Sequence, residues 1–376
     1  MFLSLMKKKV LFVATEFASG MIPYASTIIN ALADDSRFEV SCLCVNSGNK
    51  SYKRHISSNV NATFVEYPTF KTLKLLYKFY PVRVFRKMMD LIETESPDVI
   101  HFLTGDFSLA LSLMISVKNK SKMFYTVHDL TPHETVKQSF VKSCFRNYYL
   151  WGNKQMRVMI NNITTSSKRQ VEMLREMYPQ KSISFAPFPT LITKDIENGQ
   201  QQVPELKGHA PYLLYFGNIN KYKGVDLLVK AYEKSKLSDK VKLVIAGKGG
   251  MYDHIMGPNI IRLNRFIDDE EVGYLFKNAR FVIYPYRSAT MSGVLSLAFY
   301  FKKKVLLSDI PFFKQYNNTL CTYFQAKDVD DLTEKLLDVY GKTQNIDNSG
   351  NNSYYSFYSL DSLRNSYYNI YNGKEL

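Results

Sequence analysis

The chain has 376 residues, of which 45% are hydrophobic, and its formal net charge is +15. This length is too great for one ordinary hydrophobic core and favours two domains. The most apolar stretch, Val294–Phe301, is far shorter than the roughly 18–20 residues that span a bilayer. The first residues carry their charges after the apolar side chains rather than before them, so a secretory signal is not expected.

The four cysteines are scattered without the spacing of a zinc site or a disulfide framework, which favours a reduced, cytoplasmic setting. They are Cys42, Cys44, Cys144 and Cys321. Two basic segments lack acidic residues: Phe70–Met89, which is also rich in aromatic and aliphatic side chains, and Thr135–Val171. Each could contact the inner face of an anionic membrane, or could simply be helix with a solvated basic face. No nucleic-acid-binding motif is present, so no nucleic-acid partner is expected.

In the N-terminal half, residues 7–190 alternate strand and helix patterns, which indicates parallel βαβ units. The predicted strands are Val10–Ala14, Val40–Val45, Ala62–Tyr67, Val99–Leu103, Met123–Val127 and Asn162–Thr165. The helical patterns include Tyr24–Ala33, Pro81–Glu93 and Ser167–Met177. The polar segment 195–210 lacks periodicity and predicts an interdomain linker.

The C-terminal half has the pattern of a second doubly wound α/β domain. The predicted buried strands are Tyr212–Phe216, Lys242–Ala246 and Phe281–Tyr284. Ligands of such sheets bind beyond the carboxyl ends of the strands, where loops follow all of these segments. The loops contain small residues, which let backbone N–H groups face an anion, and several cations. These cations are Lys221, Lys223, Lys248 and Arg287.

Three motifs in this half resemble the donor domain of family 4 glycosyltransferases, which are retaining enzymes. They are Phe-Gly followed by Lys-Gly-Val-Asp-Leu-Leu within 216–228, Val-Ile-Ala-Gly-Lys-Gly at 244–249, and Tyr-Arg-Ser-Ala-Thr-x-Ser-Gly-Val at 286–294. The resemblance covers roughly residues 7–372 and implies the α/β GT-B fold, in which two doubly wound Rossmann-like domains face a central cleft.

The resemblance also implies a division of the chain into domains. We expect an N-terminal acceptor-side domain over 1–194, the linker over 195–210 and a nucleotide-sugar donor domain over 211–345. In the segment 346–376, a low-complexity stretch precedes a helix, Ser359–Tyr371, that is expected to cross back to the N-terminal domain.

Glycosyl transfer requires that the charge growing on the departing nucleoside diphosphate be stabilised. The Asp-x-Asp motif Asp328–Asp330 could hold a metal, but it directly precedes a helical pattern and is expected to cap that helix. The resemblance instead implies that Lys223 binds the diphosphate without metal or cofactor. Lys221 could assist, and Arg287 could bind diphosphate or acceptor or pair with an acid.

The remaining donor-binding candidates lie in loops. They are Gly20, Gly217, Asn218, Gly247, Thr290, Ser292, Gly293 and Val294. Ser292 or Thr290 could cap the helix that is predicted to begin near Leu295, so that the N–H groups of Gly293 and Val294 point at the β-phosphate. A capped helix without a ligand is the alternative. Asn218 stands where the family usually has Arg, and Gly20 stands in the family's first loop.

On the acceptor side, the predicted strand before His128 and Asp129 ends in a segment that resembles the family's Val-His-Asp. The resemblance implies that His128 lies near the transferred sugar as a catalytic residue and that Asp129 is its acceptor-side neighbour. A histidine at the end of a strand can also be structural. His101 matches a family pattern in which the histidine is mostly structural.

One departure from the family concerns two glutamates, whose positions are taken here by Ala289 and Leu297. The function expected is transfer of a sugar, with retention and by front-face attack, to a glycan or lipid-linked acceptor in surface polysaccharide assembly. A non-catalytic GT-B partner of another transferase and a nucleotide-sugar epimerase are the alternatives.

Overall fold

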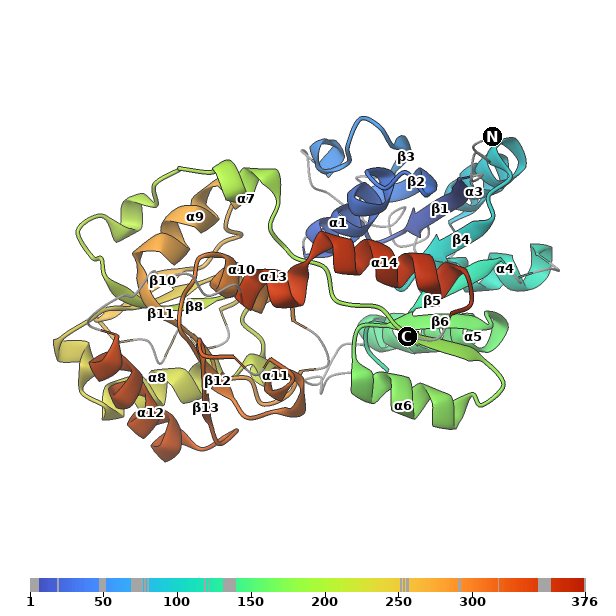
Figure 1. Cartoon of the computed structure of the whole chain (residues 1–376). Coiled ribbons are helices and arrows are strands. Elements are labelled where there is room, and N and C mark those ends of the chain that lie inside the picture. Colours follow the sequence, from blue (N-terminus) through green and yellow to red (C-terminus); the bar gives the residue numbers. More distant parts are fainter. Residues whose placement is uncertain are drawn as a thin grey trace. The chain divides into compact units, whose positions relative to one another are not determined.

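The computed structural model describes residues 7–374 with gaps. The gaps are residues 19, 47–51, 69–76, 78, 80, 118–119, 121, 131–139, 251, 253, 255–256, 290–291, 317 and 344–352. The chain divides into an N-terminal unit, Met1–Pro189 with Leu360–Leu376, and a C-terminal unit, Thr190–Ser359. Each unit is a parallel sheet with helices on both faces (Figure 1).

The N-terminal unit contains a seven-stranded sheet of order β3-β2-β1-β4-β5-β6-β7. The strands are β1 (Lys8–Ala14), β2 (Phe38–Asn46), β3 (Asn61–Glu66), β4 (Val99–Phe102), β5 (Met123–Thr126), β6 (Asn162–Thr165) and β7 (Ser182–Phe185). The helices are α1 (Met21–Ala33), α3 (Val82–Glu95), α4 (Ala110–Ser116), α5 (Phe140–Met159), α6 (Lys168–Met177) and α14 (Leu360–Tyr371). Successive β1 side chains enter opposite cores, as expected of a parallel sheet covered on both faces.

The C-terminal helix α14 completes the N-terminal unit by packing against α1. Tyr367 of α14 is fully buried, and the Arg364 guanidinium donates a 2.9 Å hydrogen bond to the carbonyl oxygen of Ala31 at the end of α1. The carbonyl oxygen of Tyr371 accepts a 2.9 Å hydrogen bond from Nζ of Lys8. Residues at the two ends of the chain therefore share one hydrophobic core.

The C-terminal unit contains a six-stranded sheet of order β10-β9-β8-β11-β12-β13. The strands are β8 (Tyr212–Phe216), β9 (Leu243–Ala246), β10 (Ile260–Leu263), β11 (Ala279–Tyr284), β12 (Val305–Ser308) and β13 (Cys321–Phe324). The helices are α7 (Lys194–Asn198), α8 (Val225–Lys234), α9 (Asp269–Asn278), α10 (Val294–Tyr300), α11 (Pro311–Lys314), α12 (Val329–Lys342) and α13 (Ser353–Tyr358). The order reverses at β8 and β11, where a ligand crevice is expected in doubly wound sheets.

The segment 195–210, predicted as a linker, lies inside the C-terminal unit. Although this segment is mostly polar, it contains Ile196, Val203 and Leu206, whose side chains are buried in the core of this unit. The hydroxyl of Thr193 donates a 2.6 Å hydrogen bond to Asp269, which joins the start of α7 to α9. The change of unit occurs instead between Pro189 and Thr190.

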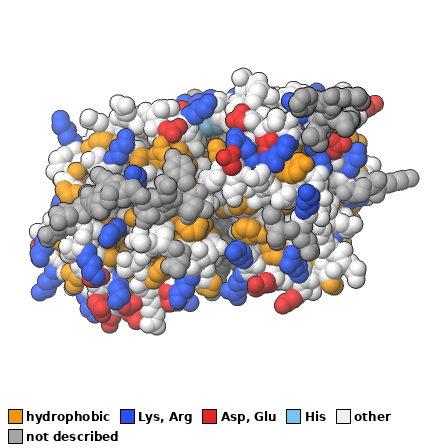
Figure 2. All heavy atoms as spheres, in the orientation of Figure 1, with side chains coloured by type: hydrophobic (Ala, Val, Ile, Leu, Met, Phe, Trp, Pro, Cys, Tyr) orange, Lys and Arg blue, Asp and Glu red, His pale blue; other side chains and the backbone are white. Residues whose placement is uncertain are grey.

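The basic segment 70–89 is described only in part, and α3 is its main described element. Val84 and Met88 are buried, whereas Arg83, Arg86 and Lys87 are exposed, so α3 is amphipathic and presents a basic side at the surface. Lys and Arg side chains are scattered over the face seen in Figure 2 rather than gathered into one patch. Within the described part of the chain, no helix is long and apolar enough to cross a membrane.

Candidate functional site

In the C-terminal unit, the loops after β8, β9 and β11 touch one another through glycines. Gly217, Gly224 and Gly247 have φ angles of +137°, +68° and +144°, which other residues rarely adopt. A Cβ atom on Gly247 would overlap the carbonyl oxygen of Gly217, and one on Gly224 would overlap that of Pro285. All three positions therefore favour glycine for backbone conformation, and Gly224 and Gly247 also require it for space.

Hydrogen bonds to backbone carbonyl oxygens join the same loops. The N–H of Ile219 donates to the carbonyl oxygen of Lys248 at 2.9 Å, which joins the loop after β8 to the loop after β9. The Arg262 guanidinium donates to the carbonyl oxygens of Gly247, at 2.7 Å, and Gly249. The hydroxyl of Tyr215 donates to the carbonyl oxygen of Asn218 at 2.9 Å. These bonds join the described parts of the loops after β8 and β9 to each other and to β10.

Lys223 lies within this framework, directly before α8. Its side chain is only 9% exposed, and its Nζ lies 3.8 Å from the ring centroid of Tyr286 and 5.1 Å from that of Tyr222. The π-faces of these rings stabilise a cation without neutralising its charge. Burial raises the pKa of the Tyr286 phenol, so this ring stays uncharged beside the ammonium group. The sequence reasoning identified Lys223 but not the two tyrosines.

Arg287 pairs with an acid, which is one of the alternatives considered for it. Its guanidinium donates to both carboxylate oxygens of Asp226, at 2.8 and 2.6 Å, and also to the carbonyl oxygen of Lys221, at 2.7 Å. Burial opposes ionisation of Asp226, but the hydrogen bonds from Arg287 outweigh it and hold the pKa of the carboxyl below its usual value. Arg287 therefore ties the loop after β11 to α8, while the side chain of Lys221 is exposed.

Helix α10 begins at Val294, one residue before the predicted start near Leu295, and Gly293 is its N-cap. Among the described residues no side chain caps this helix, and the hydroxyl of Ser292, one of the two suggested caps, instead lies 3.4 Å from that of Tyr286. The other predicted cap, Thr290, lies outside the described residues. Leu297, which replaces a family glutamate, is 2% exposed and packs in the core.

The Asp-x-Asp motif caps a helix, as predicted. The Asp328 carboxylate accepts hydrogen bonds from the N–H groups of Asp330 and Asp331 at 2.8 and 3.0 Å, at the start of α12. Asp330 pairs with Lys234 on α8 at 2.5 Å. The motif thus fastens α12 in place, and its carboxylates are engaged with protein groups.

In the N-terminal unit, His128 lies just beyond the end of β5. Its Nε2 is 2.6 Å from the carbonyl oxygen of Leu103, which can only accept, so Nε2 carries the proton. Burial lowers the pKa of His128, which keeps the ring neutral and leaves Nδ1 as an acceptor. The ring packs edge-on against Tyr24 at 4.9 Å, and the neighbouring Asp129 is exposed. Gly20 is the exposed N-cap of α1, with open space where a Cβ would lie.

His101 is a structural residue in the core of the N-terminal unit. It is fully buried, with Nδ1 2.6 Å from the hydroxyl of Tyr371 on α14 and Nε2 2.9 Å from that of Thr126. Burial lowers the pKa of His101 to about 3, so the imidazole is neutral and serves as a hydrogen-bonding link between α14 and the sheet.

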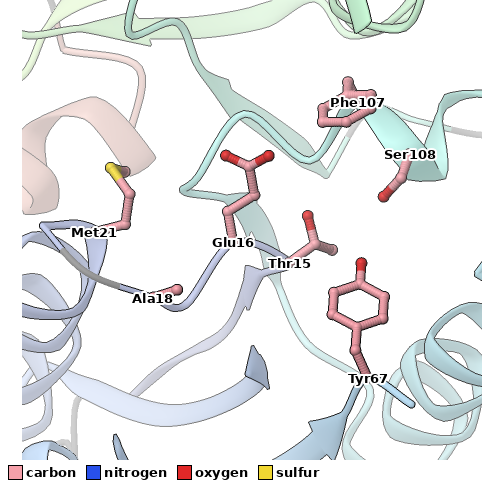
Figure 3. A pocket seen from close by; sticks show the side chains of 7 residues that line it. All are labelled: Thr15, Glu16, Ala18, Met21, Tyr67, Phe107 and Ser108. Atoms are coloured by element: carbon pink, nitrogen blue, oxygen red, sulfur yellow. The ribbon is translucent and has the colours of Figure 1, made fainter. Parts of the chain in front are cut away.

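A pocket that the sequence reasoning missed opens at the carboxyl ends of β1, β3 and β4, and its volume is about 160 Å³ (Figure 3). It is lined by Thr15, Glu16, Ala18, Met21, Tyr67, Phe107 and Ser108. Polar residues directly after predicted strands were the available signal, because ligands of these sheets bind at that edge. Gly20 lies in the same loop as Ala18.

Comparison with known proteins finds a family model that matches the C-terminal part. Residues 197–354 match the family described as glycosyl transferases group 1. This region contains the predicted donor domain motifs and every loop around Lys223. A comparison with curated proteins found no match.

Solved structures resemble the whole chain. HepE of Anabaena, crystallised with UDP and glucose, is 12% identical to this chain, with a TM-score of 0.67. The match covers 97% of this chain and 100% of the HepE chain. Sucrose-phosphate synthase of Thermosynechococcus elongatus is 12% identical with a TM-score of 0.70, covering 98% and 99%. The lipopolysaccharide outer core galactosyltransferase WaaB is 16% identical with a TM-score of 0.61, covering 97% and 99%. These likenesses confirm the predicted fold class, GT-B.

Proposed function

We propose that this chain is a GT-B glycosyltransferase that transfers a sugar from a nucleotide-sugar donor with retention. The observation that carries the proposal is the position of Lys223, a nearly buried cation on two aromatic rings within loops that glycines hold together. The region that contains it matches glycosyl transferases group 1, and HepE, with a similar fold, was crystallised with UDP and glucose.

In this proposal Lys223 stabilises the diphosphate as it leaves, and the nearby N–H groups of Asn218 and Gly293 assist. A preorganised cradle costs little reorganisation at the moment of reaction, so its charge and dipoles can stabilise the leaving group. Arg287 holds the loop after β11 against α8 through Asp226 and so positions the cradle. No step requires a metal, because the developing charge meets a fixed ammonium group.

The N-terminal unit supplies the acceptor side. His128 is neutral and keeps Nδ1 as a hydrogen-bond acceptor, which suits a sugar hydroxyl rather than an anion. With no carboxylate at Ala289 or Leu297, front-face attack by the acceptor hydroxyl is the mechanism proposed. Asp129 would contribute on the same side.

The test is a thermal-shift panel with UDP, GDP, ADP, CMP and their sugar conjugates, without metal and then with magnesium. A nucleotide at about 100 times its dissociation constant stabilises the folded state by roughly 2.7 kcal/mol. Lys223→Ala should weaken diphosphate binding by about 1.5–3 kcal/mol, the loss of one charge-assisted hydrogen bond. Lys230→Ala, at an exposed lysine of α8, is the matched control. Normal binding and turnover by Lys223→Ala would refute the assignment.

A non-catalytic nucleotide-binding partner of another transferase is the second candidate. It is favoured by one observation: both family glutamates are missing, and Leu297 is buried in the core. Such a protein would bind a donor without releasing nucleoside diphosphate when acceptors are present. Release of the diphosphate, measured with a coupled assay, therefore separates the two.

We also propose that the acceptor is a glycan or lipid-linked glycan of surface polysaccharide assembly, made in the cytoplasm at the inner face of the membrane. The exposed basic face of α3, with Arg83, Arg86 and Lys87, supports attraction to anionic lipid. Cosedimentation with vesicles that contain phosphatidylglycerol tests this. Binding should fall when these residues are replaced by glutamine, and should be no stronger than to neutral vesicles if the proposal is wrong.

A further inference from the structure

Three hydroxyl groups lie buried together in the N-terminal unit. They belong to Tyr24 of α1, Ser166 directly after β6 and Tyr367 of α14, residues that are 2%, 3% and 0% exposed. Helices α1 and α14 pack against each other (Figure 1), and all three residues belong to the same unit. Among the described residues, none of these hydroxyl oxygens has a hydrogen-bond partner. Buried polar groups in folded proteins are nearly always paired, so a partner of another kind is expected here.

The three hydroxyls are neighbours. Burial raises the pKa of the Tyr24 phenol to about 12. The hydroxyls of Ser166, Tyr367 and Thr126 oppose this rise, because they lie close enough to the phenol oxygen to interact with it. The Thr126 hydroxyl is already engaged, since it lies 2.9 Å from Nε2 of His101. The other three therefore form a cluster in which no member bonds directly to another.

The chemistry of this cluster suits a water molecule better than an ion. Burial raises the pKa of both phenols, so they keep their protons. Burial also lowers the pKa of His101 and of His128, so both nearby imidazoles are neutral. An ion in such a place would lack a charged partner, which is costly. A buried water typically makes about three hydrogen bonds to groups that are otherwise unpaired, and three hydroxyls, each able to donate or accept, provide them.

The cluster is connected to His128 through Tyr24. The two rings pack edge-on with their centroids 4.9 Å apart, while Nε2 of His128 donates to the carbonyl oxygen of Leu103 at 2.6 Å. The position of the Tyr24 ring therefore helps to set the direction in which Nδ1 of His128 points. Tyr367 comes from α14, so a molecule that bridges the hydroxyls of Tyr367 and Tyr24 joins this helix to the ring against which His128 packs.

We propose that one buried water molecule bridges the hydroxyls of Tyr24, Ser166 and Tyr367, and that through this water α14 holds the Tyr24 ring against His128. Tyr24 and Tyr367 are then positioning residues. The role toward His128 rests on the proposed glycosyltransferase function, in which this imidazole faces the acceptor, whereas the water site does not depend on that function.

The first test compares crystal structures of the full chain with those of Ser166→Ala and Tyr367→Phe, at a resolution that shows ordered water. The unsubstituted chain should show one water about 2.6–3.0 Å from the three hydroxyl oxygens, and each variant should lose it. Tyr358→Phe is the matched control and should keep the water, because the Tyr358 hydroxyl is also buried without a described partner but lies in the C-terminal unit. Three hydroxyls that bond directly to one another, with no water between them, would overturn the proposal.

The second test follows the ring signals of His128 by NMR in the full chain with isotope-labelled histidine, assigned with the help of His128→Gln. Ser166→Ala changes no aromatic ring, so a shift of these signals in that variant reports a movement of the neighbouring rings. Ser166→Ala and Tyr367→Phe should both shift the His128 signals, and Tyr358→Phe should leave them in place. Unchanged signals in both variants would refute the coupling of α14 to His128.

Failure of this inference and failure of the proposed function give different results, because neither test uses a nucleotide or a sugar. A nucleotide thermal shift in a protein whose His128 signals ignore both variants overturns the coupling alone. A bridging water and shifted His128 signals, in a protein that no nucleotide stabilises, support the water site and count against the transferase.

Discussion

The contact between the loops after β8 and β9 can be tested with two glycines that differ in one respect. Gly217 and Gly247 have similar φ angles, +137° and +144°, so alanine suffers similar backbone strain at both, about 1–3 kcal/mol. At Gly217 the nearest atoms to a new Cβ are two side-chain atoms 3.9 Å away. At Gly247 the new Cβ overlaps a backbone carbonyl, which adds about 1–3 kcal/mol of overpacking. Gly247→Ala should therefore destabilise the C-terminal unit by about 2–6 kcal/mol.

The assay is hydrogen exchange of peptides from β8, β9 and α8 across a urea series. The only tryptophan, Trp151, lies in the N-terminal unit, so its fluorescence follows that unit and should not change in either variant. Gly20→Ala is a further control, because its φ is −63° and no atom lies within 4 Å of the new Cβ. Equal destabilisation by Gly217→Ala and Gly247→Ala would refute the close contact of the two loops.

Three further changes have defined outcomes. Asp328→Ala removes the N-cap of α12 and should cost about 1 kcal/mol in urea unfolding, whereas Asp330→Ala, which removes an exposed ion pair and one acid of the first turn, should cost less. Because the pKa of His101 is lowered to about 3, the folded state resists protonation, so stability is lost as pH falls from about 6.5 toward 3. His101→Gln should flatten this loss when tryptophan fluorescence is followed against urea at each pH, and an unchanged slope would contradict it. Asp226→Asn breaks the ion pair with Arg287 and should destabilise the C-terminal unit by about 1–3 kcal/mol, chiefly above the lowered pKa of the carboxyl, as hydrogen exchange of α8 would report.

Local sequence pattern was sufficient for the strands that carry long apolar runs. The predicted bounds of Tyr212–Phe216 match β8, because this segment is wholly apolar and ends at Gly217, and those of Asn162–Thr165, with three β-branched residues, match β6. The edge strand β10 was not predicted, because Arg262 interrupts the apolar pattern of Ile260–Leu263. The segment 195–210 was predicted as a linker because it is mostly polar. Its few apolar side chains are nevertheless buried and hold it in the C-terminal unit.

Only part of the candidate site could be predicted from the sequence, because its contacts join residues that are far apart in the chain. Lys223 could be recognised from the Lys-Gly step before a helix, but the ring of Tyr286 that supports it comes from another strand end. The pairing of Arg287 with Asp226 spans 61 residues and depends on β8 and β11 lying side by side. The pocket required the strand order β3-β2-β1-β4, which places the loops of Glu16, Tyr67 and Ser108 together.

The docking of α14 sets the order in which the chain can fold during synthesis. The N-terminal unit is translated first, yet its buried imidazole at His101 and its core around α1 are completed only by residues 360–371. The C-terminal unit is continuous in sequence, so it can fold without α14. A released chain that is truncated before α14 would therefore expose the apolar surface of its first domain while its second can still fold, and it would be a target for chaperones and proteases.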